Sequence, residues 1–230
     1  MAQELTTEES RLECIKNMGE NLGELYHYLW QELASLYSKW QEFIELFATK
    51  PNRIDLMNES SPYFFRIIED VLWENIVLSI ARLTDSTKSR GKDNLTICKI
   101  PDFIIDADFR KDIEAAINIA KKDSNFCRDW RNRRFAHMDY LSLLNKETNQ
   151  LEIATRERTE NALSSVANVL NKVSDKFNNS TTIFNLSGGT LGNANSLLYY
   201  IYYGLKAERD RGERIKNCEE FPDDFDHPDI

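Results

Sequence analysis

The chain has 230 residues, of which 41% are hydrophobic and 11% aromatic, and its formal net charge is −9. The acidic surplus argues against a nucleic-acid binder with a basic surface throughout, because phosphate contacts dominate such affinity, but it allows a local basic site. The four cysteines form no C-x-x-C pair, which argues against a zinc site or a disulfide framework and is typical of a reducing cytosol.

The N-terminal half of the chain predicts two long helices. A stripe of apolar residues at spacings of three or four predicts one continuous helix that ends near residues 49–52. Its members are Leu22, Leu25, Leu29, Leu33, Leu36, Trp40, Phe43 and Phe47. Ser61 as N-cap and Pro62 at the first helical position predict the start of a second helix. The polar run over residues 84–94 predicts a loop.

The C-terminal half predicts shorter helical segments. "LTICKI" indicates a helical piece broken by Pro101, and Asp108 is expected to cap the next helix. "DSNFCRDWRNRRFAH" predicts a further helix or a bent continuation, and residues 140–155 a loop or small hairpin. Helical periodicity returns between Leu163 and Phe177, and again around Leu198.

The same pass along the chain gives its organisation. No repeat or linker divides it, so we expect one all-α domain over residues 1–230, a bundle of about six helices with a long N-terminal helix. Its core should span about 20–205, and 206–230 should form a charged extension that is flexible at its end. No signal segment or run of 18 apolar residues is present, which predicts a soluble, cytoplasmic protein with no membrane contact.

Two further segments have a functional and a simpler interpretation. The glycines at 188, 189 and 192 lack the Lys-Ser/Thr ending of a phosphate-binding loop, which favours a plain connection. The tyrosines between Tyr199 and Tyr203 suit base stacking, but at helical spacing half-buried packing is the commoner role.

The most informative stretch is "RDWRNRRFAHMD", residues 128–139, in which four arginines fall within seven residues beside His137. One interpretation is a solvated helix face whose arginines pair with the surplus acids while His137 packs in the core. On a regular helix, however, Phe126, Trp130 and His137 fall within about 40° of one another, with arginines along the margin. Clustered guanidinium groups repel unless an anion is near, and phosphate is their usual partner.

This stretch resembles a known family. "RNRRFAH" is similar to the Arg-x(4–6)-His motif of the HEPN superfamily of prokaryotic toxins and defence ribonucleases. "CRDWRNRRFAHMD" together with "SIARLTDSTKS", residues 79–89, resembles the abortive-infection branch over about residues 20–175. The resemblance implies an HEPN-like helical bundle that dimerises, places two motif copies across a shared cleft, and cleaves RNA without a metal or other cofactor.

The motif residues suit that chemistry. Arg131 would stabilise charge on the phosphate, Asn132 would have a positioning role, and His137 would transfer protons, since an unperturbed histidine pKa of about 6.5 suits neutral pH. Arg128, Arg133 and Arg134 are candidate RNA contacts. One histidine does not easily serve as both acid and base, so a homodimer that supplies two is chemically sensible.

One family feature is absent. Some HEPN toxins that pair with a nucleotidyltransferase antitoxin carry a modified tyrosine two residues after the histidine. Here that position is Asp139, and the tyrosine follows at Tyr140. Regulation by that route is therefore in doubt.

Two functions stay open at this point. The first is an RNA endonuclease that acts as a toxin or phage-defence effector, with RNA and a possible antitoxin or regulatory protein as partners. The second is a non-catalytic HEPN-type helical module that binds a partner protein or a nucleotide. The Arg-Asn…His set favours the first, and the acidic net charge favours the second.

Overall fold

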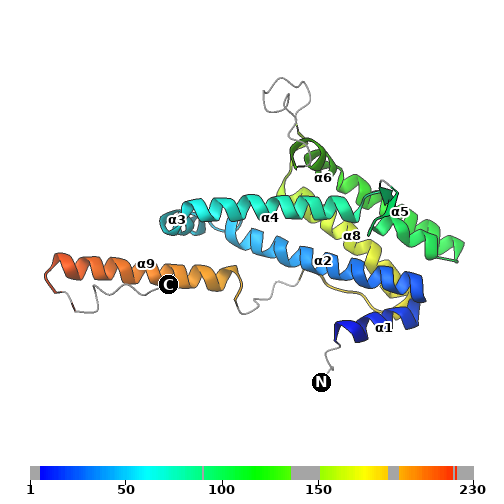
Figure 1. The fold of residues 1–230 in the computed structure, drawn as a ribbon, viewed down its shortest axis with the longest axis horizontal. Coiled ribbons are helices and arrows are strands. Elements are labelled where there is room, and N and C mark those ends of the chain that lie inside the picture. The colour runs from blue at the N-terminus through cyan, green and yellow to red at the C-terminus, as the bar shows by residue number, and fades with distance from the viewer. Residues whose placement is uncertain (1–5, 90, 136–150, 186–191, 220, 222–230) are drawn as a thin grey trace. The chain divides into compact units, whose positions relative to one another are not determined.

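The computed structural model describes residues 6–89, 91–135, 151–185, 192–219 and 221 (Figure 1). Residues 1–40 and 72–186 form one compact unit, here called the first unit, and residues 41–71 and 187–230 form a second unit. Within the described residues the only strands are two of two residues each, so the expected all-α fold is confirmed.

The helices and strands follow one another in a simple order. They are α1 (Thr7–Met18), α2 (Glu20–Phe47), α3 (Pro51–Ser60), α4 (Pro62–Leu83), β1 (Lys88–Ser89), β2 (Lys92–Asp93), η1 (Ile97–Phe103), α5 (Ala107–Asp123), α6 (Asn125–Trp130), η2 (Arg131–Phe135), α8 (Arg156–Asn178) and α9 (Ala194–Lys216). The long helix α2 ends at Phe47, and α4 begins at Pro62, as the sequence predicts.

Three details of the prediction are wrong. The polar run after α4 is not wholly a loop, because β1 and β2 pair in it with Lys88 opposite Asp93. Pro101 lies inside the 3₁₀ segment η1 and does not end it. The cap of α5 is Asp106, whose carboxylate accepts the backbone N–H groups of Asp108 and Phe109 at 3.1 Å each. Asp108 therefore stands in the first turn, where a carboxylate favours the positive end of the helix dipole.

The first unit buries the apolar faces of its helices in a common core. α5 packs along α8, and side chains of both helices are fully buried there. The largest buried side chains of this unit include Leu29, Leu33, Leu36, Ile76, Ile80, Ile113, Phe126, Leu163 and Leu170. The stripe that predicts the long helix is thus the core face of α2 in this unit.

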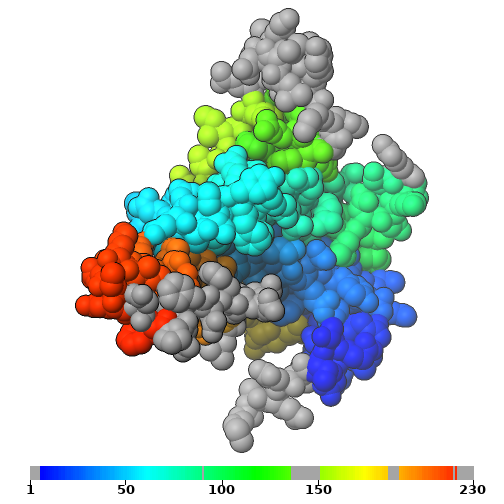
Figure 2. All heavy atoms as spheres, turned by 60° about the vertical axis from the view of Figure 1, so that its left-hand side comes forward, coloured from blue at the N-terminus to red at the C-terminus, as the bar shows by residue number. Residues whose placement is uncertain are grey.

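The contact between α1 and α2 depends on Gly23. A Cβ atom at this position would lie 2.5 Å from the carbonyl oxygen of Cys14 and 2.5 Å from the Cα of Ile15, closer than side chains tolerate. The backbones of the two helices therefore touch there. Figure 2 shows the atoms of α1 (dark blue) directly against those of the following helix.

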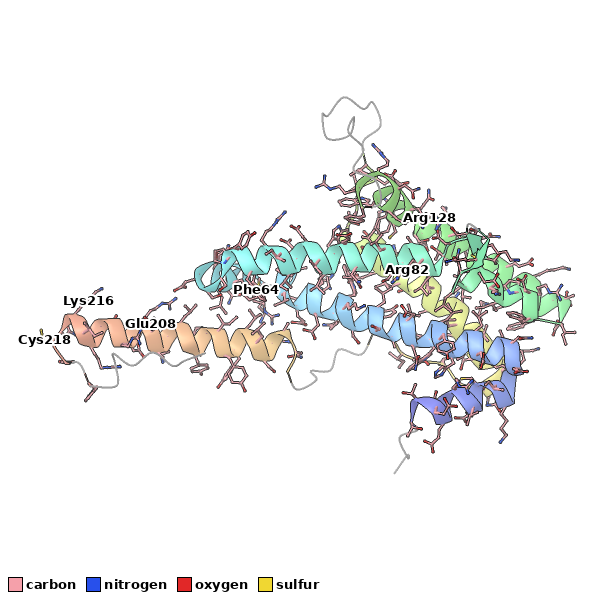
Figure 3. The ribbon with its side chains drawn as sticks, viewed as in Figure 1. Phe64, Arg82, Arg128, Glu208, Lys216 and Cys218 are labelled. Carbon is pink, nitrogen blue, oxygen red and sulfur yellow. The ribbon has the colours of Figure 1, made fainter. Side chains whose placement is uncertain are left out.

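The second unit contains α3, α9, the end of α2 and the start of α4. α3 packs on α9, and its core includes Ile44, Met57, Phe65 and Leu198. On the outside, Phe64 is 54% exposed (Figure 3), and the four tyrosines of α9 are 49–71% exposed. These tyrosines contact one another, and the rings of Tyr199 and Tyr203 are 4.6 Å apart.

Candidate functional site

The arginine-rich segment begins at a corner between helices. α5 ends at Asp123, Ser124 is buried at the corner, and α6 carries Arg128 and Trp130. The indole N–H of Trp130 donates to the carbonyl of Glu152 at 2.8 Å, and its ring meets the edge of Trp73 at 5.8 Å. Phe126 below them is fully buried. The segment therefore rests on an ordered apolar base.

From Arg131 the backbone is not a regular α-helix. Residues Arg131–Phe135 form one π-helical turn, η2, and a π-helix has more residues per turn than an α-helix. The α-helical projection at 100° per residue therefore does not hold over Arg131–Phe135. His137 lies outside the described residues, so its place beside Phe126 and Trp130 stays a prediction.

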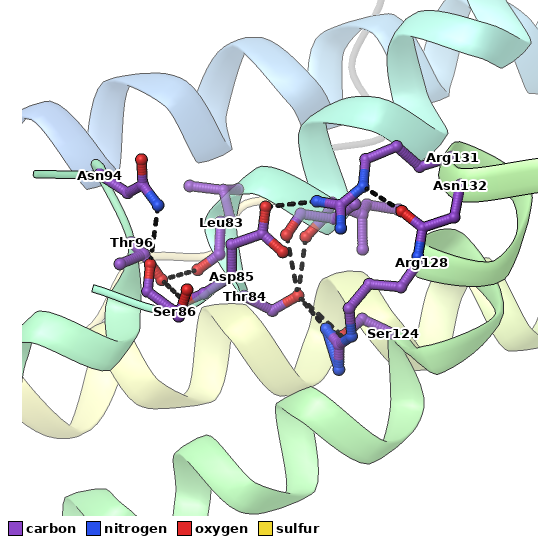
Figure 4. Close-up of polar contacts among 12 residues, drawn as sticks. Leu83, Thr84, Asp85, Ser86, Asn94, Thr96, Ser124, Arg128, Arg131 and Asn132 are labelled. Atoms are coloured by element: carbon purple, nitrogen blue, oxygen red, sulfur yellow. Dashed lines mark hydrogen bonds and ion pairs between the residues drawn. The ribbon is translucent and has the colours of Figure 1, made fainter. Parts of the chain in front are cut away.

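Arg131 has a carboxylate partner from a distant part of the chain. Its Nη1 forms an ion pair with Oδ2 of Asp85, and its Nε donates to Oδ1 of Asn132 at 3.1 Å (Figure 4). The two charged side chains are 26% and 24% exposed, so the pair lies at the surface but is largely covered. The guanidinium plane of Arg131 is thus held at two edges.

Asp85 is itself held by the turn that follows α4. The hydroxyl of Thr96 lies 2.8 Å from the carbonyl oxygen of Asp85 and 3.0 Å from that of Leu83. Asn94 donates to the carbonyl of Ser86 at 2.9 Å. The carboxylate of Asp85 also lines a hollow of about 200 Å³ together with polar side chains of α2 and α4. The anion opposite Arg131 is therefore fixed by the fold.

Arg128 has a different set of partners. Its Nη1 donates to the hydroxyl of Thr84 at 2.9 Å (Figure 4), and its Nη2 donates to the carbonyl of Lys121. Thr84 is 1% exposed, and its oxygen also lies 2.9 Å from the hydroxyl of Ser124. Arg128 therefore joins the end of α4 to the corner between α5 and α6 through neutral acceptors.

The other two arginines differ: the side chain of Arg133 is 20% exposed, and Arg134 is exposed. Arg133 forms an ion pair with Asp129 at 3.5 Å, within one turn of helix. Arg134 is exposed and forms no ion pair with any residue of the described ranges. The structure therefore brings Arg131 and Asn132 together with Asp85. Arg128, in contrast, donates its hydrogen bonds to other parts of the chain, and Arg134 is exposed to solvent.

Two other kinds of chemistry are not supported by the described residues. Burial raises the pKa of the Cys127 thiol to about 12, so this cysteine is protonated and is no nucleophile at neutral pH. In the ranges that the structure describes, no three His, Cys, Asp or Glu side chains gather closely enough to hold a metal ion.

Among the helices of the described residues, none has the length and apolar character to cross a membrane.

The family of the chain is shown by a comparison with known protein families. The model of HEPN_AbiU2, described as AbiU2, matches residues 19–189. The chain belongs to the HEPN AbiU2 family. The resemblance to an abortive-infection HEPN branch is thereby confirmed, and the match extends past the 20–175 range expected from the motifs. No curated protein and no solved structure matches the chain.

Asp85 is the residue that sequence reasoning missed. It lies within "SIARLTDSTKS", which carries part of the resemblance to the AbiU2 family's branch, but no role was assigned to it. Its only signal is a carboxylate in a polar run directly after a buried helix. The 46 residues that separate it from Arg131 hide the pairing from any local pattern.

Proposed function

We propose that this AbiU2-family protein is a metal-independent RNA endonuclease of HEPN type that acts as a toxin or phage-defence effector in the cytoplasm. Its site would be composite, with Arg131, Asn132 and His137 contributed by each chain of a homodimer. The observation that carries the proposal is the surface pair of Arg131 and Asp85 at a π-helical turn, inside the range that the family model matches.

The held geometry of Arg131 suits phosphate binding. A guanidinium has five N–H donors, and the contacts with Asp85 and Asn132 use one at Nη1 and one at Nε. Three donors remain for a phosphodiester, including both on Nη2. Because the guanidinium is already oriented, it would lose little freedom when charge develops on the phosphorane.

His137 would supply the proton transfers in this mechanism. One imidazole would take the proton of the 2′-hydroxyl, and the imidazolium of the second chain would give a proton to the leaving 5′-oxygen. Asn132 would then position Arg131 through their mutual hydrogen bond. Of the candidates for contacting the RNA backbone, Arg134 has the most exposed charge; Arg133 is paired with Asp129, and Arg128 would have to share the donors that it gives to Thr84 and Lys121.

The decisive experiment measures RNA cleavage by the purified protein in excess chelator. His137→Ala should lower the cleavage rate by about 10²–10⁴, and Arg131→Ala should lose a comparable factor. Arg66→Ala is the matched control, because it removes an exposed arginine of α4 outside the motif and should leave the rate unchanged. Thermal unfolding of each variant should stay near that of the wild type.

Two results would contradict this proposal. A well-folded wild type that leaves diverse RNAs uncut, together with an unstable His137→Ala, would contradict the ribonuclease proposal. Light scattering that shows a monomer at micromolar concentrations and above would contradict the composite site.

A second function is favoured by the same ion pair. With Asp85 already neutralising Arg131 and the chain carrying −9 overall, a non-catalytic module that binds a partner protein or nucleotide needs no phosphodiester at this site. It predicts stable binding without cleavage, and an antitoxin or regulatory protein would be such a partner. The cleavage assay separates the two functions.

A further inference from the structure

A separate cavity of about 410 Å³ lies in the first unit, where α1 and α2 meet the end of α8 and the segment after it. Its volume falls within the range of small-molecule sites, about 300–1,000 Å³. Its lining shares no residue with the arginine-rich segment or with the turn that carries Asp85. Any ligand here would be recognised by different groups.

Several polar side chains of the lining are already paired. Asn17 of α1 donates to Asn178 at 3.0 Å, and Trp30 of α2 donates to the hydroxyl of Thr182 at 3.1 Å. These contacts join segments that are more than 150 residues apart in sequence. They therefore build the walls of the cavity and leave those groups satisfied.

Glu13 and His27 are not paired in this way. Both line the cavity, and His27 is only 3% exposed. Within the described ranges, no residue forms a hydrogen bond with the imidazole of His27 or any hydrogen bond or ion pair with the carboxylate of Glu13. No fully enclosed polar side-chain atom of these ranges lacks a partner, so the unpaired imidazole nitrogens of His27 keep some accessible surface, and the cavity is the space that His27 lines.

The charges of the lining define what can bind. Among the described residues no lysine or arginine lines the cavity, and Arg11, whose charge reaches His27, is paired with Glu8 and Glu24, so an anion would face Glu13 without compensation. Burial, and secondly the charge of Arg11, lower the pKa of His27, so its ring is neutral at neutral pH and offers one acceptor nitrogen. The aromatic rings of Tyr26 and Trp30 also line the cavity, and such rings attract cations.

We propose that this cavity binds a small organic cation with an ammonium or guanidinium group, whose charge is balanced by Glu13 and whose N–H groups reach His27. The source is a free amine or the Lys or Arg side chain of a peptide. Glu13 belongs to α1, outside the 19–189 range of the family match. The site does not depend on the ribonuclease proposal.

Calorimetric titration of the full chain at low ionic strength tests this site. Butylguanidine and butylamine should bind, whereas butylurea, which is uncharged and of similar shape, should not. Glu13→Gln should weaken cation binding at least about tenfold, because the charged partner of the cation becomes a neutral amide. Glu13 is exposed, so the variant should fold normally. His27→Gln should weaken binding by a smaller factor.

Glu20→Gln is the matched control, since it removes the same charge from an exposed position outside the cavity. Equal losses in the Glu13 and Glu20 variants would overturn the proposal, because they would indicate general attraction to an acidic chain. Binding of butylurea as tight as that of butylguanidine, or no binding of either cation at millimolar concentration, would also overturn it. An acetylated tripeptide amide with a central arginine separates the two sources. Binding tighter than butylguanidine indicates a peptide ligand, and weaker binding indicates a free amine.

Discussion

The turn after α4 and the cavity beside α1 differ in how completely their charged side chains are paired. At the turn, Thr84, Asp85, Arg128 and Arg131 each have a partner from another segment of the first unit. In the cavity, Glu13 remains without one in the described part of the chain. The difference teaches that dense pairing marks where the fold is fixed, whereas an acceptor without a protein partner beside a hollow marks a place to test for ligand binding.

The largest effect on stability should come from the paired side. Thr84→Val keeps the shape of a 1% exposed side chain but removes the oxygen that accepts from Arg128. A part-buried guanidinium would lose an acceptor, so we expect the free energy of unfolding to fall by about 2–3 kcal/mol in urea titrations. Ser10→Ala, at the cavity wall, should change it by less than about 0.5 kcal/mol. Equal losses would remove the distinction between the two regions.

A pH dependence should report on the cavity side. The pKa of His27 is lowered in the folded chain by burial, so the unfolded chain takes up the proton first, from about pH 6.5 downwards. Stability should therefore fall as pH decreases from 7.5 to 5.5, by at most about 1.4 kcal/mol per pH unit. Urea titrations of wild type and His27→Gln at both pH values check this. A variant that loses as much stability as the wild type would show that another group is responsible.

The smallest effect on stability should come from breaking the ion pair. Asp85→Asn removes the countercharge of a pair at the surface, so unfolding should become easier by about 0.5–1 kcal/mol only. Its RNA affinity should rise, with a steeper dependence on salt, because Arg131 then faces phosphate alone. Filter binding of an RNA at two salt concentrations measures this. Glu69→Gln, which breaks an exposed pair on α4, should change neither quantity.

The long elements were predictable because their signal is repeated. The stripe from Leu22 to Phe47 places apolar residues on one helix face over many turns, and α2 ends at the last residue of the stripe, Phe47. The short helix α1 was not predicted, since it buries only Cys14 and Met18 and so shows little periodicity. Asp106 and Asp108 are both reasonable caps by composition, and only the backbone geometry decides between them.

The candidate site was predictable in part. The residue types and spacing of the motif identified the arginine-rich segment and its family. The π-helical turn at Arg131 spans five residues, too few for a pattern to reveal. The contact with Asp85 arises only when the end of α4 meets the start of η2, which is a property of the folded unit.

Gly23 affects the cavity side of this comparison through backbone geometry alone. Because the backbones of α1 and α2 touch there, the absence of one methyl group sets the depth at which α1 sits. Any larger residue would act as a spacer, lifting α1 and carrying Glu13 away from His27 while the helices inside the family match kept their own packing. Gly23, which has no side chain, thus sets the distance between Glu13 and His27, the two groups on which ligand recognition would depend.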